Sequence, residues 1–204
     1  MYSSTLEVTE VADTQDLTVL ATAKEELGIE PSDTSQDSKL TRWIHEASAA
    51  INSRVNRVLG REKVRETFET GWTGCLDPLP LSRYPVAIID SVTAATAALA
   101  TTDYRLDGSK GLLYRNFGRW TGEVVVQYQA GYSLLSELPY DLERACLLAL
   151  RYRQTSGLRD PSIRSEEVPG VYNVSYWVGT VPGSDTLMPS EVLDLLAPYR
   201  DAVV

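Results

Sequence analysis

EVVVQYQAGYSLLSELPYDL, residues 123–142, contains the change from strand to helix on which the predicted fold depends. Residues 123–128 are rich in valine with a tyrosine, which is typical of a β-strand. Pro139 suits the first turn of a helix, and Asp141 and Glu143 favour the positive end of its dipole. The helix predicted over about 140–155 has an inner stripe at helical spacing, formed by Leu142, Ala145, Ala149 and Tyr152. We expect this helix at the centre of the core.

Two more helices are predicted upstream. The longer one covers about residues 38–59 and ends at Gly60. Its apolar residues recur at steps of three and four, which places them on one stripe: Leu40, Ile44, Ala47, Ile51, Val55 and Val58. A short helix over about 18–27 precedes it, and Gly28 stands where a helix C-cap commonly needs positive φ. These helices and the one at 140–155 are expected to pack together as a helical core.

Between these helices, residues 61–132 change to an extended pattern. Strands are predicted around 64–68, 86–92 and 123–128. Residues 103–106 and 112–115 flank Asp107-Gly108-Ser109-Lys110-Gly111, which has the composition of a hairpin loop. The fold class is therefore predicted as α+β, with antiparallel strands and hairpins inserted into a helical core at 16–157.

The two ends of the chain are predicted to be appendages of one domain covering 1–204, because 204 residues are short for two full domains. Residues 1–15 are polar and acidic and are expected to form an extended arm or a poorly ordered end. Residues 158–204 are expected to form a loop, a hairpin with a strand at 171–178, and a last helix after Pro189. That helix is terminal and follows a long loop, so it is predicted to be detachable.

Composition restricts the partners and the compartment. The net charge of −9 disfavours tight binding to the phosphate backbone of nucleic acids, since that binding needs Lys and Arg. No run of about 18 uncharged apolar residues occurs, and the N-terminus does not resemble a signal peptide, so no membrane partner is expected and the chain should stay in the cytoplasm. Cys75 and Cys146 share no ligand-like spacing and are expected to be reduced.

No enzyme motif occurs in the sequence. His45 is the only histidine and is expected on a helix, without a Gly-x-Ser-x-Gly sequence to accompany it. Zinc binding lacks ligands, and residues 108–111 do not complete a phosphate-binding loop. A hydrolase with a spatially paired set of carboxylates stays open at this point, because such a pair leaves no sequence spacing. We predict a non-enzymatic protein with no catalytic residue, metal or cofactor.

The order of elements resembles the head–tail connector, or adaptor, proteins of tailed bacteriophages and of phage-derived particles such as gene transfer agents. The resemblance covers roughly residues 17–157. Its most specific part is Tyr128-Gln129-Ala130-Gly131-Tyr132 followed by Leu138-Pro139 and a helix. Other matching parts are Leu27-Gly28-Ile29, residues 47–51, residues 81–92, Asp103-Tyr104 and Gly111-Leu112-Leu113.

The resemblance implies a structural protein of the virion neck, assembled in the cytoplasm of a bacterial host. Copies of it would form a ring, commonly of twelve, between a portal protein and a stopper or tail-terminator protein, with DNA passing through the lumen without specific binding. Portal docking is expected through the last helix, at Val192, Leu195, Leu196, Tyr199 and Arg200. Contacts between subunits or toward the tail are expected from the hairpins, at Tyr104, Arg105, Lys110, Tyr172, Tyr176 and Trp177.

A different class of function stays open beside the ring. A monomeric regulatory binding module would have the same composition, but its C-terminal helix would pack on its own core and it would remain a monomer.

Overall fold

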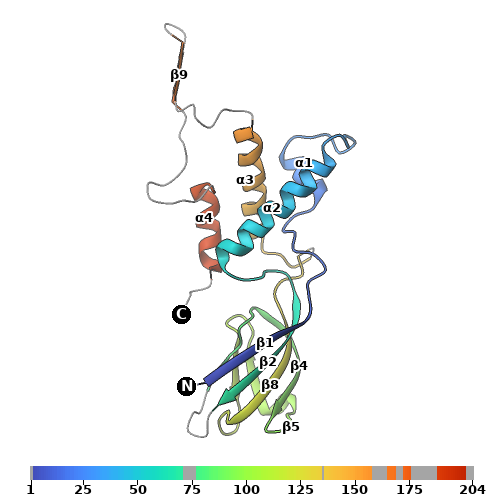
Figure 1. Ribbon diagram of the computed structural model, residues 1–204, viewed down its shortest axis with the longest axis vertical. Coiled ribbons are helices and arrows are strands. Elements are labelled where there is room, and N and C mark those ends of the chain that lie inside the picture. The colour runs from blue at the N-terminus through green and yellow to red at the C-terminus, as the bar shows by residue number, and fades with distance from the viewer. Residues whose placement is uncertain are drawn as a thin grey trace. The chain divides into compact units, whose positions relative to one another are not determined.

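A computed structural model describes residues 2–70, 77–134, 136–157, 165–168, 172–175 and 188–200 (Figure 1). The chain divides into two compact units. The sheet unit consists of Met1–Gln15 and Val58–Glu137, and the helix unit consists of Asp16–Arg57 and Leu138–Val204. Helices and antiparallel sheets are both present, so the α+β class is confirmed.

The sheet unit is built on a five-stranded antiparallel sheet in the order β1-β2-β8-β4-β5 (Figure 1). Its three long inner strands are β2 (Glu62–Thr70), β8 (Gly122–Ala130) and β4 (Val86–Ala94). The strand β1 (Tyr2–Glu10) lies at one edge, and β5 (Ala97–Ala98) pairs only with the end of β4. The strand predicted in residues 86–92 is confirmed and extends to Ala94.

A smaller sheet completes this unit, in the order β3-β7-β6. It consists of β3 (Leu79–Pro80), β7 (Leu112–Arg115) and β6 (Tyr104–Asp107), and a 3-10 turn at Thr101–Asp103 precedes β6. The predicted hairpin is confirmed, because Tyr104 pairs with Arg115 and Asp107 pairs with Leu112 around the loop.

One apolar core is shared by the two sheets of this unit. The strand β2 alternates buried and more exposed positions, as expected for a strand with one face covered. Phe68, Val124 and Val126 are fully buried and pack with Leu79 and Leu113 of the smaller sheet. Burying each side chain of this size stabilises the fold by about 1.5–3 kcal/mol relative to leaving it exposed.

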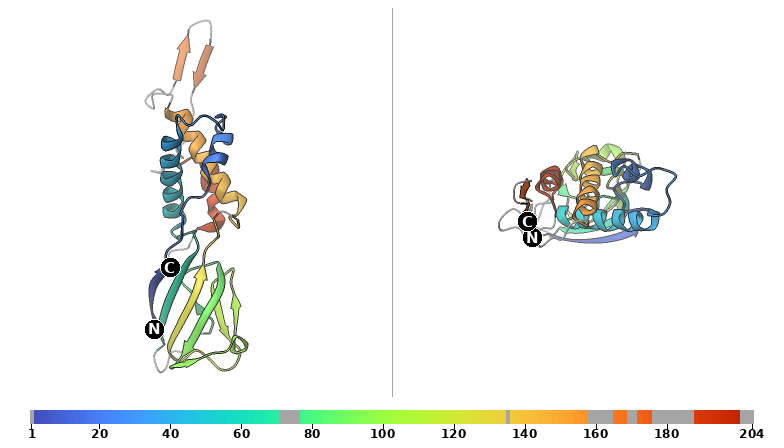
Figure 2. Two further views of the ribbon diagram at one scale, coloured as in Figure 1. Left: turned by 90° about the vertical axis from the view of Figure 1, so that its right-hand side faces the viewer. Right: turned by 90° about the horizontal axis from the view of Figure 1, so that it is seen from above.

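The helix unit contains α1 (Leu20–Glu26), α2 (Asp37–Val55), α3 (Tyr140–Gly157) and α4 (Ser190–Leu196), followed by a 3-10 turn at Ala197–Tyr199. Figure 2 shows α2 and α3 side by side in this unit. Their shared core contains Ala23, Leu40, Trp43, Ile44, Leu147 and Leu150. The strands β9 (Ser165–Val168) and β10 (Tyr172–Ser175) pair with each other as an antiparallel hairpin. None of the described helices is long and apolar enough to cross a membrane.

Two predicted boundaries differ from the structure. The long helix was expected to reach residue 59, but it ends at Val55 because Asn56 takes a left-handed conformation with φ 58°. Residues 1–15 were expected to be an arm or a poorly ordered end, whereas Tyr2–Glu10 form a strand of the main sheet. Ser4, Leu6 and Val8 of that strand pair with three buried residues of β2, namely Phe68, Glu66 and Val64. They therefore lie on the same face of the sheet as these residues.

The turn after β8 depends on a glycine. Gly131 has φ 100°, and a Cβ atom there would lie 2.4 Å from the carbonyl oxygen of Gly60. Two backbone hydrogen bonds fix the turn. Gly131 N–H donates to Pro85 O and Tyr132 N–H donates to Leu59 O, both at 2.8 Å. Close backbone contact and positive φ therefore restrict this position to glycine.

We predict that Gly131→Ala lowers the free energy of unfolding by about 2–4 kcal/mol, because backbone strain and a backbone clash add together. The matched control is Gly118→Ala, where φ is 82° and the added Cβ meets open space, so only about 1 kcal/mol of strain is expected. Urea unfolding of both variants measures the difference. Equal destabilisation would show that contact with Gly60 does not constrain this turn.

Candidate assembly surfaces

The β6–β7 hairpin, which the sequence analysis assigned to subunit or tail contacts, is held in place by backbone hydrogen bonds. Leu81 N–H donates to Gly111 O at 2.7 Å, and Val86 N–H donates to Gly108 O at 2.8 Å. A Cβ atom at Gly108 would lie 2.6 Å from Val86 O, so the loop approaches the start of β4 closely. The hairpin therefore has a fixed position within the sheet unit.

The three predicted contact residues of this hairpin differ in exposure. Arg105 is exposed and its guanidinium lies 4.5 Å from the centre of the Tyr114 ring, a cation–π arrangement. The Lys110 side chain is 71% exposed and lies 3.9 Å from Asp107. Tyr104 is only partly exposed and packs against the core. Arg105 and Lys110 are thus available to a partner, whereas Tyr104 also supports the fold.

The loop of this hairpin is ordered by Asp107. The Ser109 hydroxyl donates to the Asp107 carboxylate at 2.8 Å, and this bond is the main cause that lowers the pKa of Asp107 below its usual value. The backbone N–H of Lys110 also points to the same carboxylate oxygen, at 3.4 Å. Such side-chain bonds to nearby backbone groups are typical of tight loops.

A buried polar network supports the segment before β4. Glu66 is fully buried on β2, where its carboxylate accepts hydrogen bonds from the backbone N–H of Ser82 at 3.0 Å, from the Ser82 hydroxyl, and from the Tyr128 hydroxyl at 2.7 Å. Arg83 N–H donates to the Tyr128 oxygen at 3.2 Å. Burial, followed by the Glu66 carboxylate, raises the pKa of the Tyr128 phenol. The phenol therefore stays protonated and acts as a donor to Glu66.

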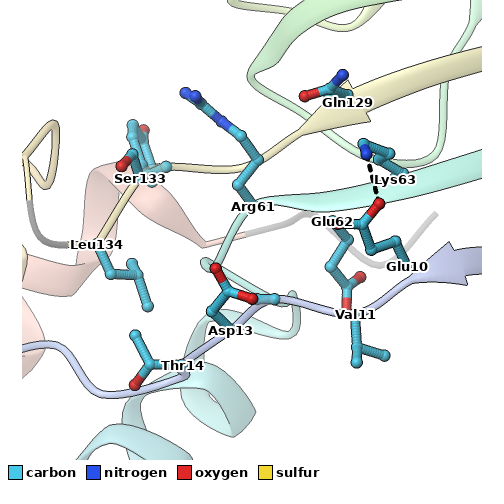
Figure 3. Close-up of a pocket in the computed structure, with 12 residues that line it drawn as sticks. Glu10, Val11, Asp13, Thr14, Arg61, Glu62, Lys63, Gln129, Ser133 and Leu134 are labelled. Carbon is cyan, nitrogen blue, oxygen red and sulfur yellow. Dashed lines mark hydrogen bonds and ion pairs between the residues drawn. The ribbon is translucent and has the colours of Figure 1, made fainter.

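A hollow of about 330 Å³ lies where β1 and β8 end (Figure 3). The segment after β1 and the segment after β8 line it, together with the start of β2: Glu10, Val11, Ala12, Asp13, Thr14, Arg61, Glu62, Lys63, Gln129, Tyr132, Ser133 and Leu134. Several of its charges are paired within the sheet unit, since Lys63 contacts Glu10 and Arg61 contacts Glu137. Within the described residues, no group of three His, Cys, Asp or Glu side chains is placed to hold a metal.

The last helix packs on its own unit. Val192 and Leu196 of α4 are almost fully buried, and α4 contacts α3 and α2. Leu195 and Tyr199 are partly exposed, and Arg200 is exposed. Of the five residues assigned to portal docking, Leu195, Tyr199 and Arg200 can reach a partner while the helix stays in place. Val192 and Leu196 could do so only if the helix left its unit.

The N-terminal edge of the main sheet is a surface that the sequence analysis missed. The residues of β1 from Ser3 to Glu10 are exposed, apart from the half-buried Leu6, and the outer edge of β1 pairs with none of the described strands. The strand itself could have been identified from the alternation of Leu6 and Val8 with polar residues, which is typical of a half-buried strand, whereas its open edge could not.

The family model for head completion proteins matches residues 17–202, which is most of the chain. This chain belongs to the head completion protein family. No curated protein matches it. Solved structures do match over almost the whole length of both chains.

Three of these structures come from gene transfer agent (GTA) particles. The neck of an empty GTA particle, computed with C6 symmetry, matches with a TM-score of 0.60 and 20% identity, covering 98% of this chain and 97% of that chain. The neck of a native GTA particle, computed with C12 symmetry, matches with a TM-score of 0.56 and 21% identity over 98% and 97%. The virion of a native GTA particle matches with a TM-score of 0.57 and 21% identity over 98% and 96%. The chain shares this fold.

Several residues that were considered in the sequence of this head completion protein lie outside its described part or away from the surfaces above. Tyr176 and Trp177 lie outside the described residues, as does Cys75, and of Tyr172 only its place in β10 is described.

His45 lies on the exposed side of α2, and its Nδ1 atom is 2.6 Å from the Asp16 carboxylate. Cys146 is buried on α3, and burial raises the pKa of its thiol to about 12. A further exposed residue that was missed is Phe117, which is 77% exposed in the loop after β7.

We predict that Tyr128→Phe lowers the free energy of unfolding by about 1–3 kcal/mol, because the buried Glu66 carboxylate loses a donor that water cannot replace. Tyr114→Phe is the matched control, since this half-buried tyrosine packs through its ring on Arg105, and a change of about 0.5 kcal/mol or less is expected. Denaturant unfolding monitors both variants. Similar values for the two variants would contradict a supporting role for the Glu66 network.

Proposed function

We propose that this chain is a structural subunit of a particle neck, where copies of it form a ring that connects the portal of a phage-like head to the tail or a stopper. The observation that carries the proposal is the head completion family match over residues 17–202. The shared fold with chains of GTA particle necks supports it, since those necks were computed with C6 and C12 symmetry. A ring of twelve is the proposed stoichiometry.

The whole chain acts as one adaptor subunit in this proposal. The helices α1, α2 and α3 form its helical core, and their shared cluster around Trp43 and Leu150 supports that role. Residues 158–204 carry the portal contact through α4, at Leu195, Tyr199 and Arg200. The β6–β7 hairpin, with Arg105 and Lys110, faces a neighbouring subunit or the tail side, as do Tyr172, Tyr176 and Trp177.

The charge of the chain supports a passive role toward DNA. A net charge of −9 gives little counterion release on a duplex, so DNA can pass a ring of such chains without binding tightly. The proposed channel therefore lets DNA pass without binding it tightly.

A second function is favoured by one observation. The burial of Val192 and Leu196 on their own unit is also what a monomeric regulatory binding module would show. A ring subunit and a monomeric module differ in the mass of the assembled protein, and in whether that mass increases when a portal protein is added.

The experiment that tests the proposal is native mass spectrometry of the chain alone and after mixing with the portal protein of the same particle. We expect a complex that carries about twelve copies of the 22.5 kDa chain on one portal ring. A chain that stays monomeric at all concentrations, with and without portal, would contradict the ring and favour the binding module.

The docking assignment predicts that Leu195→Asp combined with Arg200→Glu weakens portal binding by about tenfold or more, because both side chains are accessible on the docked helix. Arg119→Glu is the matched control, since it reverses a charge of the same sign at an exposed residue of the sheet unit to which no contact is assigned. Binding is measured by biolayer interferometry on immobilised portal. Equal weakening of portal binding by the two variants would contradict the assignment of α4 as the docking element.

A further inference from the structure

Among the described strands, the main sheet of the sheet unit has one unpaired edge, at β1, and one partly paired edge, at β4. At one edge, β1 pairs with β2 over Tyr2–Glu10, and its outer side pairs with none of the described strands. It contains no proline, lysine or arginine, and its only charged residues are Glu7 and Glu10, of which Glu10 is paired with Lys63. At the other edge, β4 is covered by β5 only at Thr93 and Ala94.

The two edges run in opposite directions. Every neighbouring pair in the order β1-β2-β8-β4 is antiparallel, so β1 and β4 point opposite ways. When the β1 edge of one copy is placed beside the β4 edge of another copy in the same orientation, the new pair is antiparallel as well. The alternation of strand directions in the sheet then continues across the junction, and antiparallel pairing is slightly more stable per residue than parallel pairing.

The register of the sheet also matches at the two edges. Val8 pairs with Val64, Val64 pairs with Tyr128, and Tyr128 pairs with Ile89, so these four residues form one row across the inner face. The row below it joins Leu6, Glu66, Val126 and Val92. Val8 is 39% exposed and Ile89 is partly exposed, although both lie on the face that covers the core. The first row thus ends at both edges in an apolar side chain that is partly exposed, whereas the second row ends at β4 in Val92, which is buried in the core.

We propose that the β1 edge of one copy pairs with the β4 edge of the next copy, over about Leu6–Glu10 and Ile88–Ser91, and that this strand junction joins neighbouring subunits. The occupant is a second copy of this chain, because the two edges complement each other in strand direction and in the apolar row that ends at Val8 and Ile89. A cyclic ring needs an interface between two different surfaces of the same chain, and these two edges provide one. The inference rests on the proposed ring and adds the contact that closes it.

Features of β4 limit this pairing to a short stretch. Val86 N–H is already bound to Gly108 O, and Leu99 N–H is bound to Val92 O. The register shifts between Val86 and Ile88 and between Ile89 and Ser91, and such bulges restrain uncontrolled pairing of sheet edges. Asp90 is exposed in the same stretch and adds a charge. These features leave only a short part of the β4 edge free to pair. We therefore expect it to pair with a β1 strand that the ring holds in the right position, and not with any extended segment.

Disulfide trapping tests the junction. In a Cys75→Ser background, Val8→Cys combined with Ile89→Cys should form disulfides between copies, because the junction places these two side chains in one row. Within one chain they are separated by three strand spacings, about 14 Å, which no disulfide can span. The matched control pairs Val8→Cys with Ile88→Cys, since Ile88 is 51% exposed and, opposite Gln129, lies on the other face of the sheet.

The complex with the portal is oxidised and separated on a nonreducing gel, while its mass is measured in parallel. We expect a ladder of covalent oligomers from Val8→Cys/Ile89→Cys and about tenfold less from the control. Rings of normal mass that give no ladder would overturn the junction and leave the neck function standing. Equal ladders from both pairs, or products that stop at dimers, would also overturn it. Absence of any ring in the mass measurement would overturn the neck function and the junction together.

A second variant tests the junction without cysteine chemistry. Val8→Lys places a charge at the end of the inner row and should raise the concentration needed for ring assembly by about tenfold or more. Val11→Lys is its control, because Val11 is 70% exposed and lies beyond the paired stretch. Equal assembly of the two variants would contradict the junction.

Discussion

The pairing of β8 with a long strand on each side is the constraint on which the sheet unit depends. Nine residues of β8 pair with β2, and the same strand pairs with β4 on its other edge. Its inward residues Val124, Val126 and Tyr128 are fully buried. The Tyr128 hydroxyl then holds Glu66, which in turn binds Ser82 in the segment leading to β4. The core, the buried polar network and the base of the hairpin are therefore all anchored through one strand.

Local patterns predicted the elements of this fold better than their pairing. The valine-rich run at 123–128, the glycines around Lys110 and the spacing of Leu40, Ile44 and Ile51 each reflect a local backbone preference, and the strand, hairpin and helix are present. The strand β1 was missed because its apolar residues are only Leu6 and Val8 among polar ones, and its conformation depends on pairing with β2, some sixty residues away. The end of α2 was misplaced because Asn56, not Gly60, adopts the left-handed conformation.

The interaction surfaces were harder to predict than the fold, because an interface differs little in composition from the rest of a surface. Arg105 and Lys110 are exposed as the hairpin assignment requires, whereas Val192 and Leu196 are buried in their own unit. Amphipathic spacing in α4 could not distinguish a face that packs on α3 from one that packs on a partner. The edge of β1 carries no sequence signature of its own, since an open edge is defined by the absence of a neighbouring strand in the folded sheet.

These features together describe a protein that acts through its surfaces. The family match and the shared fold with neck chains give the role, the acidic charge suits a channel for DNA, and the two sheet edges offer a way to join copies in a cycle. Cryo-electron microscopy of particles assembled with this chain tests the central claim most directly. The account predicts a cyclic ring of this fold in the neck, between portal and tail. Particles with a complete neck from which the chain is absent would contradict it.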